Sequence, residues 1–284
     1  MTEPDEPARA AEASDAGGRQ TARRTWSDAA RLSLGTLTVL PAGVPSRVDR
    51  EVGGRAMVLA PVVGVLIGGI AAAVVLLAQL VKPDADLLAA VLGMLVVAGL
   101  SGGLHLDGLA DFADALGSRR DRETMLRIMK QSDIGPFGVV AIVGVLLLDV
   151  AALTACLQAD FGWQALLIAT TASRLTLPWS CRTSIPAARP DGLGSFVAAT
   201  VRPRTAALTT TAVLAAALAL TWLTTSADVL RLSGTAAAVL LAVVTGLLTS
   251  RRAVRALGGT TGDVLGATVE LALPVALVTL ALTV

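Results

Sequence analysis

The sequence predicts an all-α fold, namely a polytopic integral membrane bundle of about seven transmembrane helices. Hydrophobic residues make up 54% of the 284-residue chain and charged residues only 16%. The mean hydropathy is +0.70, and the apolar residues gather in long stretches rather than in short alternating runs. Each stretch is close to the roughly 20 residues that cross a bilayer as a helix.

Seven apolar segments follow one another along the chain. They occupy residues 56–81, 87–104, 137–158, 163–181, 206–225, 232–250 and 264–284. The second segment can continue into the acidic stretch that follows it, and the fourth contains Arg174 and Pro178, so these two are the least regular. Residues 26–284 are expected to form one transmembrane domain.

The N-terminal segment, residues 1–25, differs from the rest of the chain. It is rich in Ala, Glu, Asp, Gly and Arg and has no apolar core, so we expect a disordered tail. It also lacks the basic-then-apolar order of a signal peptide. Cys156 and Cys181 lie in apolar surroundings without metal-ligand spacing and are interpreted as packing residues.

The placement of Lys and Arg predicts the orientation. Eight basic residues lie in residues 1–55, five in 118–136, four in 182–205 and three in 251–263, whereas the alternate connections hold almost none. Under the positive-inside rule, the N-terminus and these connections face the cytoplasm. The expected location is therefore the cytoplasmic (inner) membrane, with seven spans placing the C-terminus outside.

Three aspartates follow the second apolar segment in the stretch HLDGLADFADAL: Asp107, Asp111 and Asp114. At about 100° per residue they fall within an arc of about 60° on a helix. Such carboxylates repel one another unless a cation lies among them, which favours Mg²⁺ or Mn²⁺ with positions left for phosphates. Gly108 would let a phosphate approach the helix. The alternative is a merely solvated helix face.

The single histidine, His105, lies two residues before Asp107. On a continuous helix it points about 160° away from the aspartates, which favours a packing or hydrogen-bonded histidine over a ligand. The residues SGG at 101–103 offer an alternative, because a helix break there would turn His105 inward.

A basic stretch, SRRDRETMLRIMK at residues 118–130, interleaves cations with apolar residues. One interpretation is an amphipathic helix on the membrane surface, in contact with anionic lipids. The other is phosphate recognition by Arg122, Arg127 and Lys130.

Two glycine-rich polar stretches lie on the same predicted side, AARPDGLGSF at 187–196 and GGTTGDVLGA at 258–267. Their candidate binding residues are Arg189, Asp191, Gly192, Thr261, Gly262 and Asp263. Each stretch by itself is an ordinary turn, and Thr261 or Asp263 can be simply a helix N-cap. Backbone N–H groups at a helix start, close to glycines, also form anion sites.

Taken in order, these motifs resemble those of a known family. HLDGLADFADALG, RDRETMLRIMK with IGPFG, ARPDGLG and GGTTGDVLGA are similar to the cobalamin synthases, the adenosylcobinamide-GDP ribazoletransferases. The resemblance runs from about Leu32 to near the C-terminus. It departs from the family at QSDIG, residues 131–135, so Asp133 receives no role. It departs again at the apolar LGTLTVLP.

The resemblance implies the last joining step of vitamin B12 assembly. The ribose 3′-hydroxyl of α-ribazole, or of its 5′-phosphate, attacks adenosylcobinamide-GDP at the cobinamide-side phosphorus and GMP is released. In this interpretation Asp107 and Asp111 hold Mg²⁺, with Asp114 as a third candidate ligand. Asp114 also orients or deprotonates the hydroxyl, and Lys130 with nearby arginines steadies phosphate oxygens. Asp191 and Asp263 can complete the metal shell, and no nucleic-acid partner is expected.

Two other functions remain open from the residues. A CDP-alcohol phosphotransferase of lipid synthesis uses a similar Asp-Gly helix, but its pattern requires Arg where Ala110 precedes Asp111. A secondary transporter would carry ions on intramembrane carboxylates, and we expect neither inverted repeats nor mid-span acids here. The sequence leaves open the phosphorylation of the acceptor, the identity of the base and the oligomeric state.

Overall fold

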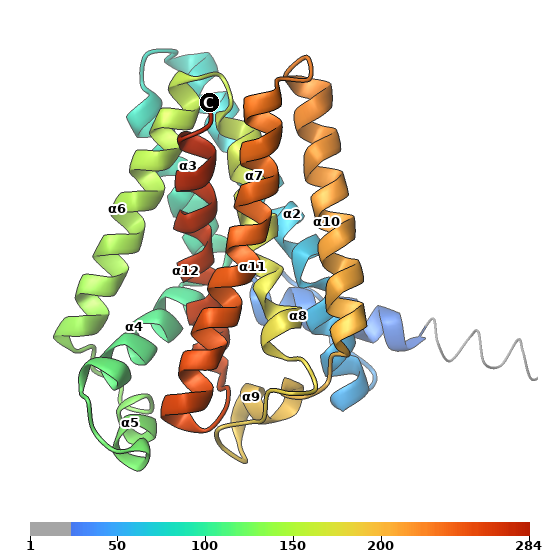
Figure 1. The fold of residues 1–284 in the computed structure, drawn as a ribbon, viewed down its shortest axis with the longest axis vertical. Coiled ribbons are helices and arrows are strands. Elements are labelled where there is room, and N and C mark those ends of the chain that lie inside the picture. Colours follow the sequence, from blue (N-terminus) through green and yellow to red (C-terminus); the bar gives the residue numbers. More distant parts are fainter. Residues whose placement is uncertain (1–23) are drawn as a thin grey trace, which may run out of the picture.

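The computed structural model describes residues 24–284, which form an elongated bundle of helices packed side by side (Figure 1). A first helix covers residues 24–37. The others are α2 (Arg50–Val81), α3 (Asp86–Leu100), α4 (Leu104–Gly117), α5 (Arg122–Ile128), α6 (Pro136–Gln158), α7 (Gly162–Arg174), α8 (Thr176–Ser180), α9 (Gly192–Val197), α10 (Pro203–Thr224), α11 (Val229–Leu257) and α12 (Gly262–Ala281). The all-α prediction is confirmed.

The predicted tail, residues 1–25, lies outside the described residues except at its end. Arg24 and Thr25 already belong to the helix over residues 24–37.

Five helices of the described chain are long and apolar enough to cross a membrane: α2, α6, α10, α11 and α12. Helices α3 and α4 together pass the same test but are bent by 86° relative to each other, as in a broken span or a re-entrant loop. The polytopic helical architecture is therefore confirmed, with five long spans, or six if the bent pair is counted as one span.

The fourth expected span, residues 163–181, is not one helix. Helix α7 has 13 residues and ends at Arg174, and the short α8 begins at Thr176. Pro178 has no N–H to donate to the carbonyl of residue 174, so a continuous helix would lose a hydrogen bond there. Together α7 and α8 still lead the chain back toward the end of the bundle where α9 lies (Figure 1).

The bend between α3 and α4 has a local cause. Gly102 and Gly103 have φ angles of +62° and +70°, in the left-handed region that favours glycine. The SGG break considered as an alternative is therefore what the structure contains. It turns α4 away from the axis of α3 and brings His105 inside, where it is 3% exposed.

Helix α12 is the most buried of the spans and packs against α4, α6, α7 and α11. Helix α2 packs against α7 through small residues. A Cβ at Gly64 would lie 2.6 Å from the carbonyl oxygen of Thr170, so only glycine permits this separation. Small residues at the contact let the two helices approach each other closely.

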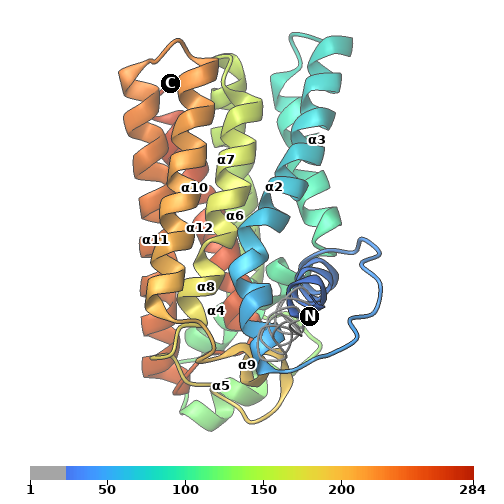
Figure 2. The ribbon, with the colours of Figure 1, turned by 90° about the vertical axis from the view of Figure 1, so that its right-hand side faces the viewer.

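One end of the bundle collects the polar connections. Helices α5 and α9, the end of α11 and the start of α12 lie together at the lower end of Figure 1, and α4 slopes toward them. Figure 2 shows the start of α2 at the same end. We call it the polar end of the bundle.

Candidate active site

A cavity of about 460 Å³ opens at the polar end. Its walls come from the first turn of α4, the loop into α9, the start of α12 and residues 35–37. Four side chains that can carry charge line it: His105, Arg189, Asp191 and Asp263. The rest of the lining is Thr36, glycines and apolar side chains.

The start of α12 forms one wall. Thr261 is the N-cap of this helix, and its Oγ1 accepts a hydrogen bond from the Val264 N–H at 3.2 Å. Asp263 lies in the first turn and accepts hydrogen bonds from the Arg189 guanidinium at 3.0 Å and from the Thr261 hydroxyl at 3.2 Å. The N-cap interpretation of Thr261 is thus correct, and Asp263 faces a cation.

The two glycine-rich stretches are in direct contact. The Ala188 N–H donates to the Thr260 carbonyl at 2.9 Å, and the Thr260 N–H donates to the Pro186 carbonyl at 2.9 Å. A Cβ at Gly194 would lie 2.6 Å from the Thr261 Cα. The predicted convergence of the loops is confirmed, and it brings Arg189 onto Asp263.

Helix α4 lies against the first turns of α12. A Cβ at Gly108 would meet the Asp263 carbonyl oxygen at 2.7 Å, and one at Gly266 would approach the His105 Cα to 3.1 Å. Gly108 therefore permits contact between two helices, which corrects its predicted role as space for a phosphate. The signal missed was the matching glycine in α12.

The three aspartates of α4 differ in exposure. Asp107 is exposed, Asp111 is half-buried and Asp114 is only 9% exposed. Because α4 slopes into the bundle, the helix face that carries the three aspartates is exposed to solvent at Asp107 and buried at Asp114. The three carboxylates are therefore not equivalent.

Asp114 caps a neighbouring helix. Its carboxylate accepts hydrogen bonds from the N–H groups of Gly135, at 2.7 Å, and Gly138, at 2.9 Å. These amides begin α6, whose N-cap residue is a glycine with no side-chain acceptor. The predicted role of Asp114 as metal ligand and base is corrected accordingly. An uncapped Gly-Pro helix start was the available signal.

The remaining acids form a group that we call the polar-end cluster: Asp107, Asp111 and Asp263 with Arg189. Asp111 interacts electrostatically with each of the other three members. Within residues 24–284, no three His, Cys, Asp or Glu side chains converge closely enough to form a metal cage. Mg²⁺ commonly takes only one or two carboxylates and completes its shell with water and phosphate, so Asp107 and Asp111 suit this ion.

Arg122 has a structural role. Its Nε donates to the Leu257 carbonyl and its Nη2 to the Ala188 carbonyl, both at 2.7 Å. It ties the end of α11 to the loop before α9, which corrects its predicted role in substrate binding. Arg127 on the same helix is exposed.

Lys130 lies at the edge of the cavity. Its Nζ is 2.9 Å from the carboxylate of Asp191, and both side chains are exposed. The hydrogen bond from Lys130 lowers the pKa of Asp191, and the positive charges of Lys130 and Arg189 act in the same direction. Gly192 follows at a φ of +80°, a conformation that favours glycine, and starts α9.

A second ionisable group that sequence reasoning missed shares His105 with the cavity lining. We call it the membrane-depth cluster: His105, Asp149, Arg174 and Glu270. All four side chains are buried, and His105 Nδ1 is 3.8 Å from Glu270 Oε1. Asp149 and Glu270 belong to spans α6 and α12. The expectation that no acid lies within a span was therefore wrong, and the two isolated acids in apolar runs were the signal.

The fold and the cavity together define a class. The protein is a polytopic helical membrane protein that gathers carboxylates, a guanidinium group and a helix start at one end of its bundle, as phosphoryl transfer requires. The chain belongs to the cobalamin-5-phosphate synthase family, whose model matches residues 29–281.

Curated relatives agree with this assignment. The chain is 40% identical over 270 residues to the adenosylcobinamide-GDP ribazoletransferase of Frankia casuarinae, which covers 90% of this chain and 95% of the relative. It is 39% identical over 246 residues to that of a Nocardioides species, covering 87% and 95%. The Pseudomonas aeruginosa UCBPP-PA14 protein of the same name is 40% identical over 263 residues, covering 88% and 96%. No solved structure matches the chain.

Proposed function

We propose that the cavity at the polar end is where this chain acts as an adenosylcobinamide-GDP ribazoletransferase. Family membership supports the reaction. The observation that carries the assignment to this cavity is the contact between Arg189 and Asp263, 3.0 Å apart. These residues come from two different family-like motifs, and Asp111 of a third motif interacts with both.

The reaction makes and breaks one phosphorus–oxygen bond. The ribose 3′-oxygen of α-ribazole, or of its 5′-phosphate, bonds to the cobinamide-side phosphorus of adenosylcobinamide-GDP. The bond between that phosphorus and the GMP oxygen breaks, and the hydroxyl proton leaves. The products are adenosylcobalamin, or its 5′-phosphate, and GMP.

Residues that line the cavity or lie beside it divide this work. Arg189 and the backbone N–H groups at the start of α12 hold phosphate oxygens, since both are donors that favour anions. Lys130 adds a positive charge at the cavity edge. Asp111, half-buried beside them, orients the attacking hydroxyl and accepts its proton.

A divalent ion belongs to the proposal. Asp107 and Asp111 would hold Mg²⁺, or Mn²⁺ in its place, through hard oxygen ligands. Bound there, the ion would neutralise charge on the pyrophosphate.

The orientation is also proposed. The polar end carries the connections with five, four and three basic residues, 118–136, 182–205 and 251–263. Under the positive-inside rule this end, the cavity and the N-terminus face the cytoplasm. The membrane is the inner one, and residues 26–284 act as one catalytic domain.

The test is GMP release by the purified full-length protein in detergent. Adenosylcobinamide-GDP is supplied with α-ribazole or with its 5′-phosphate, in Mg²⁺ and then in EDTA. Asp107→Asn and Asp111→Asn should lower turnover by at least about 10²-fold, and the exposed Asp133→Asn serves as the matched control. Turnover that does not depend on metal would refute the requirement for a divalent ion. Normal activity in both aspartate variants would refute the location of the active site.

A further inference from the structure

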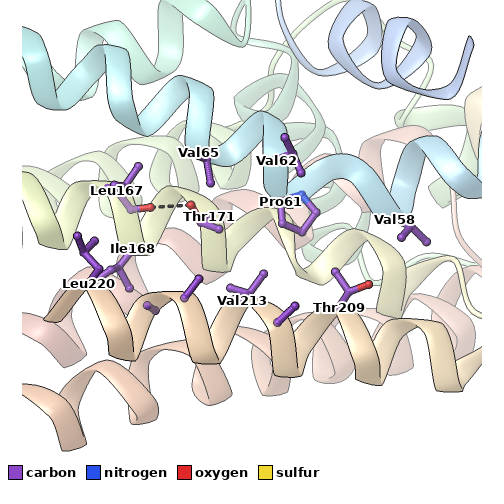
Figure 3. A pocket seen from close by; sticks show the side chains of 13 residues that line it. Val58, Pro61, Val62, Val65, Leu167, Ile168, Thr171, Thr209, Val213 and Leu220 are labelled. Carbon is purple, nitrogen blue, oxygen red and sulfur yellow. Dashed lines mark hydrogen bonds between the residues drawn. The ribbon is translucent and has the colours of Figure 1, made fainter. Parts of the chain in front are cut away.

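A second cavity lies outside the candidate active site, between α2, α7 and α10 (Figure 3). It measures about 430 Å³ and its lining is almost entirely apolar. Val62 and Val65 of α2 are 62% and 48% exposed, so the cavity opens on the surface that faces lipid. We call it the α2–α10 groove.

The groove exists because α10 presents small side chains to α7. Ala212, Ala216 and Ala217 line it on α10 and leave space beside Ile168. Its hydroxyl groups are used internally: Thr171 donates to the Leu167 carbonyl at 2.7 Å, drawn as a dashed line in Figure 3. The groove therefore offers a ligand only apolar contact.

A polar mouth continues the groove at the polar end of the bundle. A third cavity, of about 400 Å³, shares Val58 with the groove. It is lined by Trp26, Glu51, Arg55, Arg202 and Thr205, among others. An apolar slot thus adjoins a polar site that contains two arginines and Glu51.

Arg55 has a donor to spare. Its Nη2 is 2.7 Å from Glu51 Oε1, and its guanidinium lies over the Trp26 ring at 5.0 Å from the centroid. Its Nη1 is buried and has no hydrogen-bond partner within residues 24–284. A buried unpaired donor is costly, so an anionic oxygen in this cavity would be stabilising.

Arg202 provides the second charge. It is exposed, and it is the N-cap residue of α10, whose side chain makes no capping hydrogen bond. Trp26 is 44% exposed beside it, and tryptophan favours the depth at which lipid headgroups lie. The mouth therefore combines two cations with an aromatic ring of the membrane interface.

We propose that the groove and its mouth bind one anionic glycerophospholipid. The phosphate lies between Arg55 and Arg202, and one acyl chain fills the α2–α10 groove. An amphiphile with a negative head is the ligand that fits an apolar slot ending in two cations. The site is separate from the cavity that holds Arg189 and Asp263, since the two share no lining residue.

The test is native mass spectrometry of the full-length protein from micelles holding equal amounts of phosphatidylglycerol and phosphatidylcholine. The wild type should retain one phosphatidylglycerol. Arg202→Gln, alone and with Arg55→Gln, should lower the ratio of phosphatidylglycerol to phosphatidylcholine by about five-fold or more, since each removes a charge-assisted hydrogen bond. Ala216→Phe fills the slot and should expel both lipids.

Two matched controls keep the lipid. Arg204→Gln removes a nearby exposed charge, and Ala219→Phe adds a ring to an exposed position of α10; neither residue lines either cavity. Equal retention of the two lipids by the wild type would overturn the proposal, as would normal retention by Ala216→Phe. A wild-type dimer that Ala216→Phe dissociates would assign the groove to a second copy and overturn it too.

Discussion

The polar-end cluster and the membrane-depth cluster contain the same kinds of charge in different surroundings. In the first, Asp107 is exposed and Arg189 is hydrogen-bonded to Asp263. In the second, both oxygens of Asp149 and the Nε and Nη2 atoms of Arg174 are buried with no hydrogen-bond partner within the described residues. One cluster is open to substrate, and the other is enclosed by α4, α6, α7 and α12 except where His105 reaches the cavity lining.

This difference in exposure suggests different roles for the two clusters, substrate binding for the first and stability of the fold for the second. Charges beside a cavity can exchange water for phosphate or metal with little change in protein structure. The enclosed charges interact electrostatically, Arg174 with Asp149 and Glu270, and removing one partner leaves a buried charge uncompensated. Function and stability should therefore respond to different substitutions.

The largest effect is expected from Arg174→Met. It leaves Asp149 and Glu270 without their cation and should lower the free energy of unfolding by about 3–5 kcal/mol. Thermal unfolding in detergent measures it. The double variant Arg174→Met with Asp149→Leu should recover part of the loss, and equal instability of the two variants would contradict the charge argument.

Arg189→Met tests the polar-end cluster, for which we expect a loss of activity without a loss of stability. It should lower kcat/KM for adenosylcobinamide-GDP by about 10²-fold because a donor to phosphate is lost. The unfolding temperature should change little, since Arg189 lies at a cavity wall. Arg189→Lys is the control that keeps charge but loses the fork, and it should be intermediate. A variant that unfolds instead would place Arg189 among the structural residues.

Asp114→Ala tests whether Asp114, which belongs to neither cluster, stabilises the fold or takes part in the reaction. It removes the acceptor of two backbone N–H groups at the start of α6 and should destabilise the protein by about 1–3 kcal/mol. The Mg²⁺ concentration that gives half-maximal GMP release should stay unchanged, because the Asp114 carboxylate is occupied by the backbone N–H groups of Gly135 and Gly138. A clearly higher Mg²⁺ requirement would restore Asp114 to the metal set.

Lys130→Gln should have the smallest effect. Lys130 and Asp191 are both exposed, and such ion pairs contribute little to stability. Because the folded-state pKa of Asp191 is lowered, the contribution of the pair is present above the unfolded pKa and is lost as pH falls through the folded pKa. Unfolding temperatures of variant and wild type should therefore differ less at pH 3, below the ordinary pKa of an aspartate, than at pH 7.

Several features could be predicted from the sequence because their causes are local. Apolar runs of sufficient length form spanning helices, and the SGG stretch offered a possible helix break at residues 101–103, where Gly102 and Gly103 have positive φ angles. The basic residues predicted that three connections lie at one end, and the structure brings them together there. The convergence of Arg189 with Asp263 follows from that arrangement.

Other features were decided only by tertiary structure. Asp111 and Asp114 belong to one motif and one helix face, yet Asp114 caps α6 because α4 slopes toward that helix start. Gly108 and Arg122 look like phosphate-binding residues along the chain, but each contacts a segment more than 60 residues away.

By itself, the sequence of this protein determined which segments lie in lipid and which lie in water, because transfer between the two depends on local composition. It also determined which charged residues gather at one membrane face. Only the tertiary structure decided which of those charges stay open to a substrate. A carboxylate binds whatever donor the fold places within about 3 Å, and for Asp114 and Asp263 those donors come from distant parts of the chain.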